Sequence, residues 1–510
     1  MKRNNIVLLL LAVMTVLVIV TACGRKSYSV PEQPAQTQEK LNIFPDYTDV
    51  VVPPNIAPLN FMVKSEGKSY VVEMKSGDAR IVAGGETDGK IFFDEADWRT
   101  FVTSAKGHEA TVTVYAKQEN GWVAFAPYRL TIAEEPIDNY LSYRLIEPSY
   151  EYYRQLGLYQ RNVTNYDERP IYENNRKYDT KENHCVNCHN YQNYSTKNML
   201  FHVRSNMGGT VISLDGKAEK MNMKCDSILS SSVYPSWHPT QPWIVFSSNK
   251  TGQTFHMLDK EKVEVVDYAS DLIFYDAANK KIRNVLKTND QMETFPCWTP
   301  TGDKIFYCSA PFPGPEDTPD SMRTKFIVNN YKDIKYNVMS LTFDASTQTF
   351  GEPNMEVDCR SMGGSASVPR VSPDGKFVLF TMGEYGQFHI WHKSSDLYVK
   401  NLETDSVYAL AEANSSDVDS YHSWSSNGRW IVFSSRRDDG SFTRLYIAYF
   451  DKQGKAHKAF MLPQLDPEKN VMLFKSYNVP ELTKDSVRIS SETFHDIIYN
   501  HDGVPVTYGK

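Results

Sequence analysis

One pattern recurs four times along the latter part of the chain and limits its fold more than any other feature. Each copy has an aromatic or apolar residue, a polar turn and an apolar strand. The copies are YPSWHPTQPWIVFSS (234–248), FPCWTPTGDKIFYCS (295–309), VPRVSPDGKFVLFTM (368–382) and YHSWSSNGRWIVFSS (421–435). Repetition at steps of this length indicates one supersecondary unit that is stacked several times.

Further strands lie between these copies. DLIFYDAANKKIRNVL (271–286) and DLYVKNLETDSVYAL (396–410) each predict two strands joined by a polar turn. Each repeat then holds four strands, which is the pattern of a β-propeller blade. Because a blade usually spans about 40 to 50 residues, these blades carry inserted loops. We expect an all-β protein with a propeller of five or six blades at 197–475 and a C-terminal tail at 476–510.

The repeats resemble those of TolB-type propellers. SPDGKFVLF after VPR, and WIVFSS after YPSW, carry the resemblance. TPTGDK and SSNGRW differ only at the turn, whereas HPTQPW lacks the turn glycine. The whole chain also resembles a group of lipoproteins that join a c-type haem motif to such a propeller. That resemblance implies an architecture more than an activity.

A short motif precedes the repeats. HCVNCHNY (184–191) places Cys185 and Cys188 in a C-x-x-C spacing, and His189 follows at once. Thiols at this spacing attach a haem through its vinyl groups, and the histidine reaches the iron from the same turn. A zinc site needs more ligands nearby, but Cys225 is the next cysteine. A thioredoxin-like pair needs a βαβ context, which is absent. We therefore expect one covalent haem c, with His189 as an iron ligand.

The second axial ligand of the iron would decide the chemistry, because a filled position favours electron transfer and an open one favours peroxide or another small ligand. Candidates are His184, Met199, His202 and Met207. Alignment of MLFHV with IVFSS of the next repeat places Met199 towards the blade core and His202 on the opposite face. We expect His202 as the second ligand, with Met199 as the alternative. Arg204 shares the face of His202 and could pair with a haem propionate or face solvent.

Residues 135–196 predict a tyrosine-rich connector that carries the haem motif. PSYEYYRQLGLYQR (148–161) could form one short helix before Pro, Asn and Asp break the pattern. The tyrosine rings could wall a haem edge or pin the connector to a neighbouring domain. The alignment of repeats also puts the motif in the place of the first strand of the first blade. We therefore expect the haem to lie against the propeller and not in a separate cytochrome domain.

The first residues look like an export signal. A basic start and an apolar run lead to VTAC, which ends at Cys23. This pattern predicts a lipoprotein signal peptide at 1–22 and lipidation of Cys23, with an uncleaved membrane anchor as the alternative. Residues 23–40 have little apolar content and predict a flexible tether. We expect a lipid-anchored protein of the bacterial cell envelope that faces the periplasm, at the outer membrane rather than the inner one.

Residues 41–134 predict a small β-sandwich of immunoglobulin-like type. ATVTVYA (110–116) alternates apolar and polar residues, and Asn120-Gly121 turns the chain into a second strand. The net charge of −7 and the lack of a basic block argue against nucleic-acid binding. No Ser-His-Asp set, paired carboxylates or phosphate loop can be identified, so hydrolase chemistry has no support.

These features together favour a monohaem c-type cytochrome that transfers electrons and docks a redox or envelope protein partner on one propeller face. The alternatives are a TolB-like interaction protein with a structural or sensory haem, and a peroxidase-like haem enzyme. The remaining cysteines of the body could form two disulfides or stay as four thiols: Cys225, Cys297, Cys308 and Cys359.

Overall fold

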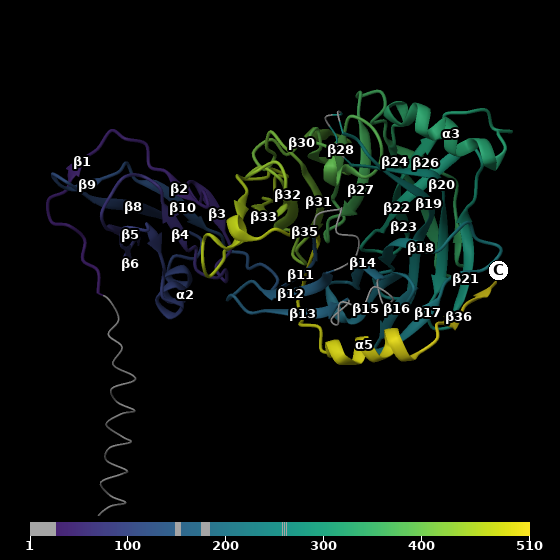
Figure 1. Cartoon of the computed structure of the whole chain (residues 1–510), viewed down its shortest axis with the longest axis horizontal. Coiled ribbons are helices and arrows are strands. Elements are labelled where there is room, and N and C mark those ends of the chain that lie inside the picture. Colours follow the sequence, from purple (N-terminus) through teal and green to yellow (C-terminus); the bar gives the residue numbers. More distant parts are fainter. Residues whose placement is uncertain are drawn as a thin grey trace, which may run out of the picture.

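The computed structural model describes residues 27–147, 155–174, 184–257, 259, 261 and 263–509. In these ranges the chain is mostly β-structure, arranged as an N-terminal domain beside a propeller (Figure 1). The all-β expectation is therefore confirmed. The signal peptide predicted at 1–22 and the lipidation site Cys23 lie outside the described residues.

The described residues form six sheets that are arranged as the blades of the propeller. Blade 1 contains β11 (Tyr140–Ile146), β12 (Leu156–Asn162), β13 (Glu168–Glu173) and β35 (Ser476–Thr483). Blade 2 contains β14 (His184–Gln192), β15 (Ser195–Ser205), β16 (Gly209–Leu214) and β17 (Lys217–Asn222). Blade 3 contains β18 (Ser232–Trp237), β19 (Trp243–Phe255), β20 (Val263–Asp276) and β21 (Lys281–Leu286).

The other three blades follow in chain order. Blade 4 contains β22 (Gln291–Trp298), β23 (Lys304–Pro311), β24 (Asn337–Asp344), β25 (Thr349–Phe350) and β26 (Asn354–Val357), and α3 (Asp320–Asn330) is inserted in it. Blade 5 contains β27 (Ser365–Val371), β28 (Phe377–Gly383), β29 (Asp396–Asn401) and β30 (Val407–Ala409). Blade 6 contains β31 (Asp419–Trp424), β32 (Trp430–Ser435), β33 (Arg444–Tyr449) and β34 (Phe460–Met461). The higher of the two expected blade counts is correct.

Blade 1 joins strands from distant parts of the chain. β35 is its inner strand and pairs antiparallel with β11, with Tyr140 opposite Thr483. The boundaries predicted for the propeller, 197–475, are therefore too narrow at both ends. The helix considered for 148–161 is also wrong from Leu156 onward, because β12 pairs with β11 on one side and β13 on the other. Residues 148–154 lie outside the described part of the chain.

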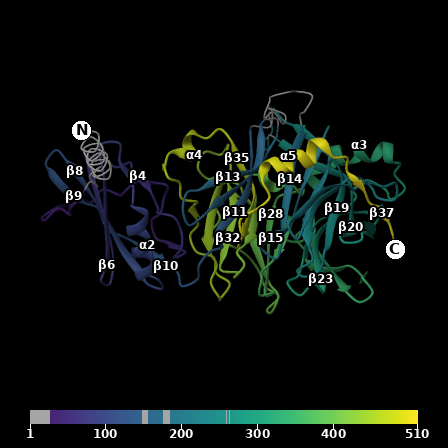
Figure 2. The same ribbon diagram turned by 90° about the horizontal axis from the view of Figure 1, so that it is seen from below.

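The segment predicted as a C-terminal tail continues the propeller after β35. α5 (Ser491–Asn500) lies along blades 1 and 2 (Figure 2), where Phe494 packs edge-on against Phe201 at 5.2 Å between ring centroids. β36 (Val504–Pro505) then pairs with the outer strand of blade 2, and β37 (Thr507–Tyr508) with that of blade 3. The C-terminus thereby links three neighbouring blades.

The N-terminal domain has two sheets around one core. The larger contains β1 (Ala35–Gln36), β3 (Val50–Val52), β5 (Tyr70–Ser76), β6 (Ala79–Gly85), β8 (Glu109–Gln118), β9 (Gly121–Ala124) and β10 (Tyr128–Ile132). The smaller contains β2 (Ile43–Phe44), β4 (Phe61–Val63) and β7 (Lys90–Ile91). The sequence did not predict α2 (Glu95–Ser104), which Asp94 caps and which buries Trp98 and Phe101. This helix departs from the immunoglobulin-like pattern expected for 41–134.

The tether predicted at 23–40 is wrong over part of its length. Tyr28 and Val30 pack against an apolar cluster of the larger sheet, and β1 pairs in parallel with β9. Burial of these two side chains and the β1 pairing hold the segment on the domain, because they offset the backbone entropy that it loses. A single larger apolar cluster also joins the N-terminal domain to blade 6. Within the described ranges, no helix is long and apolar enough to span a membrane.

Candidate functional site

Each inner strand of the propeller carries the same backbone kink. One residue per strand has a positive φ, and the register with the neighbouring strand shifts beside it, as in a β-bulge. The six residues and their φ angles are Cys188 (50°), Tyr234 (47°), Phe295 (53°), Val368 (50°), Tyr421 (52°) and Val479 (49°). Proline follows the kink in four of the strands, and His189 and His422 follow it in the other two.

The kinks bring side chains together at the centre of the propeller. The five kink residues other than Cys188 belong to one apolar cluster, which also includes Phe388, Ile390 and Trp391 from blade 5. A cavity of about 870 Å³ lies against this cluster. Its volume is within the range of roughly 300–1,000 Å³ that is usual for ligand and cofactor sites. Residues that line it include Arg144, Cys185, Cys188, His202, Arg204, Tyr234, Phe388, Trp391, Tyr421 and Val479.

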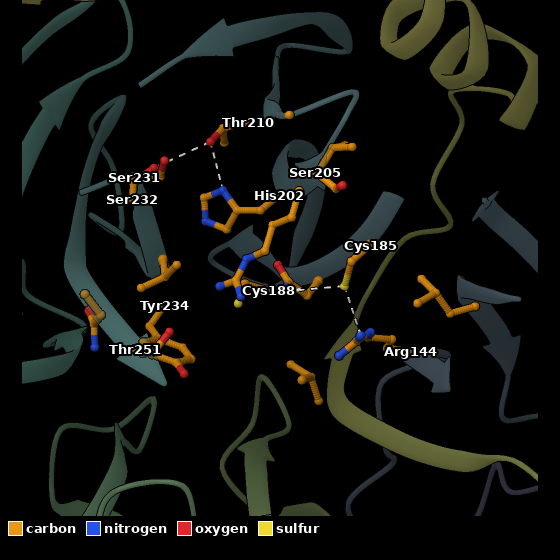
Figure 3. Close-up of a pocket in the computed structure, with 18 of the residues that line it drawn as sticks. Arg144, Cys185, Cys188, His202, Ser205, Thr210, Ser231, Ser232, Tyr234 and Thr251 are labelled. Carbon is orange, nitrogen blue, oxygen red and sulfur yellow. Dashed lines mark hydrogen bonds between the residues drawn. The ribbon is translucent and has the colours of Figure 1, made fainter. Parts of the chain in front are cut away.

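Both cysteines of the C-x-x-C motif line this cavity (Figure 3). Cys188 stands at the kink of β14, and burial raises the pKa of its thiol. Cys185 lies opposite Arg204 in the ladder between β14 and β15. The Nη2 atom of Arg144, from β11 of blade 1, donates a hydrogen bond to Cys185 Sγ at 3.2 Å. The motif forms the first strand of a blade, as predicted, but of blade 2 and not of the first blade, because β11–β13 and β35 form a blade before it.

His202 reaches the same cavity from β15 (Figure 3). Its Nδ1 atom is hydrogen-bonded to Thr210 Oγ1 at 2.8 Å, while Nε2 is buried and has no hydrogen-bond partner. Burial lowers the pKa of His202 to about 3, and the nearby charge of Arg204 acts in the same direction. The imidazole is therefore neutral at physiological pH, which is the state that binds a metal ion.

His189 is also buried, but it is not one of the residues that line the cavity. Neither ring nitrogen forms a hydrogen bond of ordinary geometry, although backbone groups of Ser142 and Val479 are near. Burial lowers the pKa of His189 to about 3, with a smaller contribution from Arg144. The structure therefore brings Cys185, Cys188 and His202 together and leaves His189 beside blade 1.

His422 occupies the equivalent kink position in blade 6 and behaves differently. Its Nδ1 atom is 3.4 Å from Thr381 Oγ1, and its Nε2 atom is 3.2 Å from the carbonyl oxygen of Leu379. Both of its nitrogens therefore have partners inside the protein. The fold therefore tolerates a histidine after the kink. It does not require that the ring nitrogens of this histidine lack hydrogen-bond partners, because those of His422 have them.

The other candidate ligands lie away from the cavity. Met199 is 1% exposed and belongs to the apolar cluster between blades 1 and 2, and Met207 packs against that cluster. The predicted core orientation of Met199 is therefore confirmed. His184 Nε2 is hydrogen-bonded to Tyr172 at 2.7 Å. Arg204 is exposed and lines the cavity on the face of His202, as the alignment predicted.

Sequence reasoning missed two residues of the site, Arg144 and Thr210. Arg144 belongs to a blade that the sequence assigned to a connector, so nothing marked it as a neighbour of Cys185. Thr210 lies directly opposite His202 in the ladder, which the predicted pairing of consecutive strands could have indicated. The described cysteines are all free thiols, so the disulfide alternative is not adopted. No group of three or more His, Cys, Asp or Glu able to hold a metal ion occurs in the described ranges.

A covalent haem needs two thiols, an iron ligand and an enclosing wall. Cys185, Cys188, His202 and several aromatic residues line one cavity of suitable volume. These residues are suited to bind a haem. His189 could reach the same haem only after a local rearrangement of the kink. No further metal-binding cluster is needed, because the porphyrin itself supplies the equatorial ligands of the iron.

Comparisons with known proteins give no family for the chain. No family model matches it, and no curated protein matches it. Among solved structures it is similar to the β-propeller domain of the Trilobed protease from Pyrococcus furiosus (11% identity, TM-score 0.32, 70% of this chain and 95% of that one). It is also similar to an oligogalacturonate lyase in complex with manganese (14% identity, TM-score 0.29, 68% and 87%). At these TM-scores the likenesses carry no argument, and the propeller rests on the sheet topology of this chain.

Proposed function

We propose that the cavity beside the kink residues, called the axial cavity from here on, holds one haem c attached through Cys185 and Cys188. The protein would then be an electron-transfer cytochrome of the cell envelope. One observation carries the proposal. Both cysteines of the motif line the same cavity as His202, whose buried Nε2 atom has no hydrogen-bond partner. A buried polar atom without a partner is costly, because the hydrogen bond that it made to water is not replaced. An iron ion at this position would satisfy the nitrogen.

Attachment needs only the two thiols and the vinyl groups of the haem. At each cysteine the sulfur would bond to the inner vinyl carbon and the thiol hydrogen would go to the outer carbon, so no oxidant would be consumed. The bound group supplies one-electron chemistry at the iron. Tyr234, Tyr421 and Trp391 would place aromatic surface against the porphyrin, and Arg204 lines the same cavity.

In this proposal His202 and His189 would hold the iron. His202 already lines the cavity, so it binds without a change of strand register. His189 follows Cys188 directly in the chain, but the kink would have to turn to bring its imidazole to the cavity. Two histidine ligands would favour electron transfer at the iron over peroxide chemistry.

A reduced-minus-oxidised absorption spectrum of the purified mature protein tests the proposal. The protein should show the sharp bands of a low-spin haem c, and they should not change when carbon monoxide is added. His202→Ala should give a form that binds carbon monoxide, while His422→Ala, the matched change in blade 6, should keep the original spectrum. Met199→Ala should lower stability without changing the iron ligands. Carbon monoxide binding by the unaltered protein would instead favour the peroxidase-like alternative.

A second candidate function has one observation in its favour. Cys188 has the positive φ that one residue of every inner strand has, and His189 follows it. This part of the motif therefore forms the kink of its strand whether or not a haem is bound. This favours a TolB-like interaction protein in which the propeller face binds an envelope protein and any haem is structural or sensory. Under that alternative, the double variant Cys185→Ser and Cys188→Ser would still capture the partner and leave respiratory electron flow unchanged.

The proposed location is the periplasmic side of the outer membrane, with an anchor at the lipidated Cys23. Tyr28 already packs on the N-terminal domain, so few residues separate this domain from the anchor. An extended chain spans at most about 3.5 Å per residue. The N-terminal domain would then lie next to the membrane, and the propeller would be free to meet a redox partner.

A further inference from the structure

We propose that Thr210 determines which ring nitrogen of His202 is left to bind a metal ion. In this arrangement Nδ1–H donates a hydrogen bond to Thr210 Oγ1, and the lone pair of Nε2 is left for a metal ion. The inference rests on the proposed haem site, and it assigns a positioning role to a residue that also lines the cavity.

The geometry between the two residues is fixed by the sheet. His202 on β15 and Thr210 on β16 are direct partners in the antiparallel ladder. Their side chains therefore project from the same face, and Nδ1 lies 2.8 Å from Oγ1. Both residues are almost fully buried, at 3% and 2% exposure. The threonine hydroxyl is therefore the partner that the buried Nδ1 atom has in the described structure.

The surroundings of Thr210 favour the direction of this hydrogen bond. A hydroxyl can donate one hydrogen and can accept at its lone pairs. Ser232 Oγ, from β18 of blade 3, lies 3.5 Å from Thr210 Oγ1 and can accept that hydrogen. Thr210 then receives Nδ1–H from His202. The reverse direction would place a hydrogen on Nε2, where the described residues offer no acceptor.

The fold itself does not require a histidine at this position. In the ladder that joins the two innermost strands of a blade, His202 pairs with Asn187, and the matching residues in blades 3 to 6 are smaller. They are Ser247, Cys308, Thr381 and Ser434. An imidazole at the blade 2 position is therefore an addition to the common blade, and it reaches into the cavity.

Another buried histidine shows what a purely structural role looks like. His389 bonds Ser367 Oγ through Nδ1 at 2.9 Å and the carbonyl oxygen of Tyr385 through Nε2 at 3.1 Å. It has no nitrogen left for a ligand, whereas His202 has one. Histidines that bind metals almost always have their second nitrogen held in this way, and loss of the holding group typically lowers metal affinity about 10- to 100-fold.

The first test uses the full mature chain, produced without haem and labelled with ¹⁵N at histidine. Long-range ¹H–¹⁵N spectra report which ring nitrogen carries the hydrogen. We expect the hydrogen of His202 on Nδ1. Thr210→Val should move a large fraction of it to Nε2, and Thr210→Ser should restore the original signal. A hydrogen on Nε2 in the unaltered protein, or an unchanged signal in Thr210→Val, would overturn the inference.

The second test uses the haem-loaded protein and its reactivity with carbon monoxide. Thr210→Val should let carbon monoxide replace His202 about 10- to 100-fold more readily, and Thr210→Ser should behave like the unaltered protein. If haem is present but Thr210→Val is indistinguishable from the unaltered protein, the positioning role is wrong and the haem proposal stands. If the unaltered protein carries no haem, the proposed function fails, and the nitrogen signals alone decide the role of Thr210.

Discussion

Cys188 occupies in blade 2 the position that Tyr234 occupies in blade 3. Both residues have a left-handed backbone, with φ of 50° and 47°, and both line the axial cavity. His189 follows the first and Pro235 the second. Such a backbone is uncommon for residues other than glycine and persists only where the surrounding structure imposes it. The C-x-x-C-H motif is therefore built on the kink of an inner strand, and the fold presents its second thiol to the cavity.

The first prediction concerns the residue after the kink. His189→Pro should fold, because four of the other inner strands have proline at this position and its missing N–H is tolerated there. We expect the free energy of unfolding of the haem-free chain to change by less than about 1 kcal/mol. Chemical denaturation measures this change. The variant should also lose one axial ligand and bind carbon monoxide when loaded with haem.

A matched change within the same blade provides the control for His189→Pro. Leu200→Pro lies in β15, which pairs with strands on both sides, so proline there removes a ladder hydrogen bond and should prevent folding. Equal loss of structure in the two variants would show that the kink of β14 differs from the others. His422→Pro should fold as His189→Pro does, because it makes the same change in blade 6.

The second prediction concerns closure of the propeller. A chain that ends at Phe474 lacks β35 and leaves β11 without its inner neighbour. We expect it to lose cooperative thermal unfolding, as followed by circular dichroism. A chain that ends at Asp502 lacks only β36 and β37, which pair at the outer edges of two blades. It should unfold cooperatively at a modestly lower temperature. Equal behaviour of the two truncations would contradict closure by β35.

The third prediction concerns Asp267, a buried carboxyl near the cavity. Asn249, which lines the cavity, donates a hydrogen bond to it at 2.8 Å, and burial raises the pKa of Asp267 to about 7. In the unfolded chain this pKa is about 3.9. Between these values the folded state binds more protons than the unfolded state. The contribution of Asp267 to stability therefore falls as pH rises through this window, by up to about 1.4 kcal/mol per pH unit.

Urea unfolding of the protein and of Asp267→Asn at pH 5 and pH 8 measures this effect. The difference between the two proteins isolates Asp267 from the other titrating groups. Asp267→Asn should lose the part of the pH dependence that comes from this carboxyl, so it should gain stability relative to the unaltered protein at pH 8. An identical pH dependence in the two proteins would mean that Asp267 is ionised in the folded state throughout.

The propeller could be predicted from sequence because its repeats are local. Residues such as Trp237 and Trp298 mark consecutive blades, and each blade is a run of hairpins whose strands alternate with a period of two. Blade 1 could not be recognised in this way. Its inner strand, β35, lies at the other end of the chain from β11–β13, and no local pattern reports a pairing between distant strands. Arg144 could not be assigned to the site for the same reason, because it belongs to that blade.

The sequence predicted only part of the candidate site, because side chains alternate regularly in one of its strands but not in the other. Strand periodicity correctly separated the faces of Met199 and His202, because β15 is regular at those positions. It could not place His189, because the bulge at Cys188 breaks the alternation of side chains at that residue. The positive φ of Cys188 is imposed by the propeller, and a single sequence carries no signal for it until the six inner strands are aligned.

The most direct test of a covalent haem in the axial cavity is the haem content of the mature protein in alkaline pyridine with dithionite. We expect the spectrum of haem c, with one haem per chain that acidified organic solvent does not extract. Cys185→Ser combined with Cys188→Ser should remove this spectrum, while Cys297→Ser in blade 4 should not. A protein matured in cells that attach haem, yet purified without haem or with an extractable one, would contradict the account.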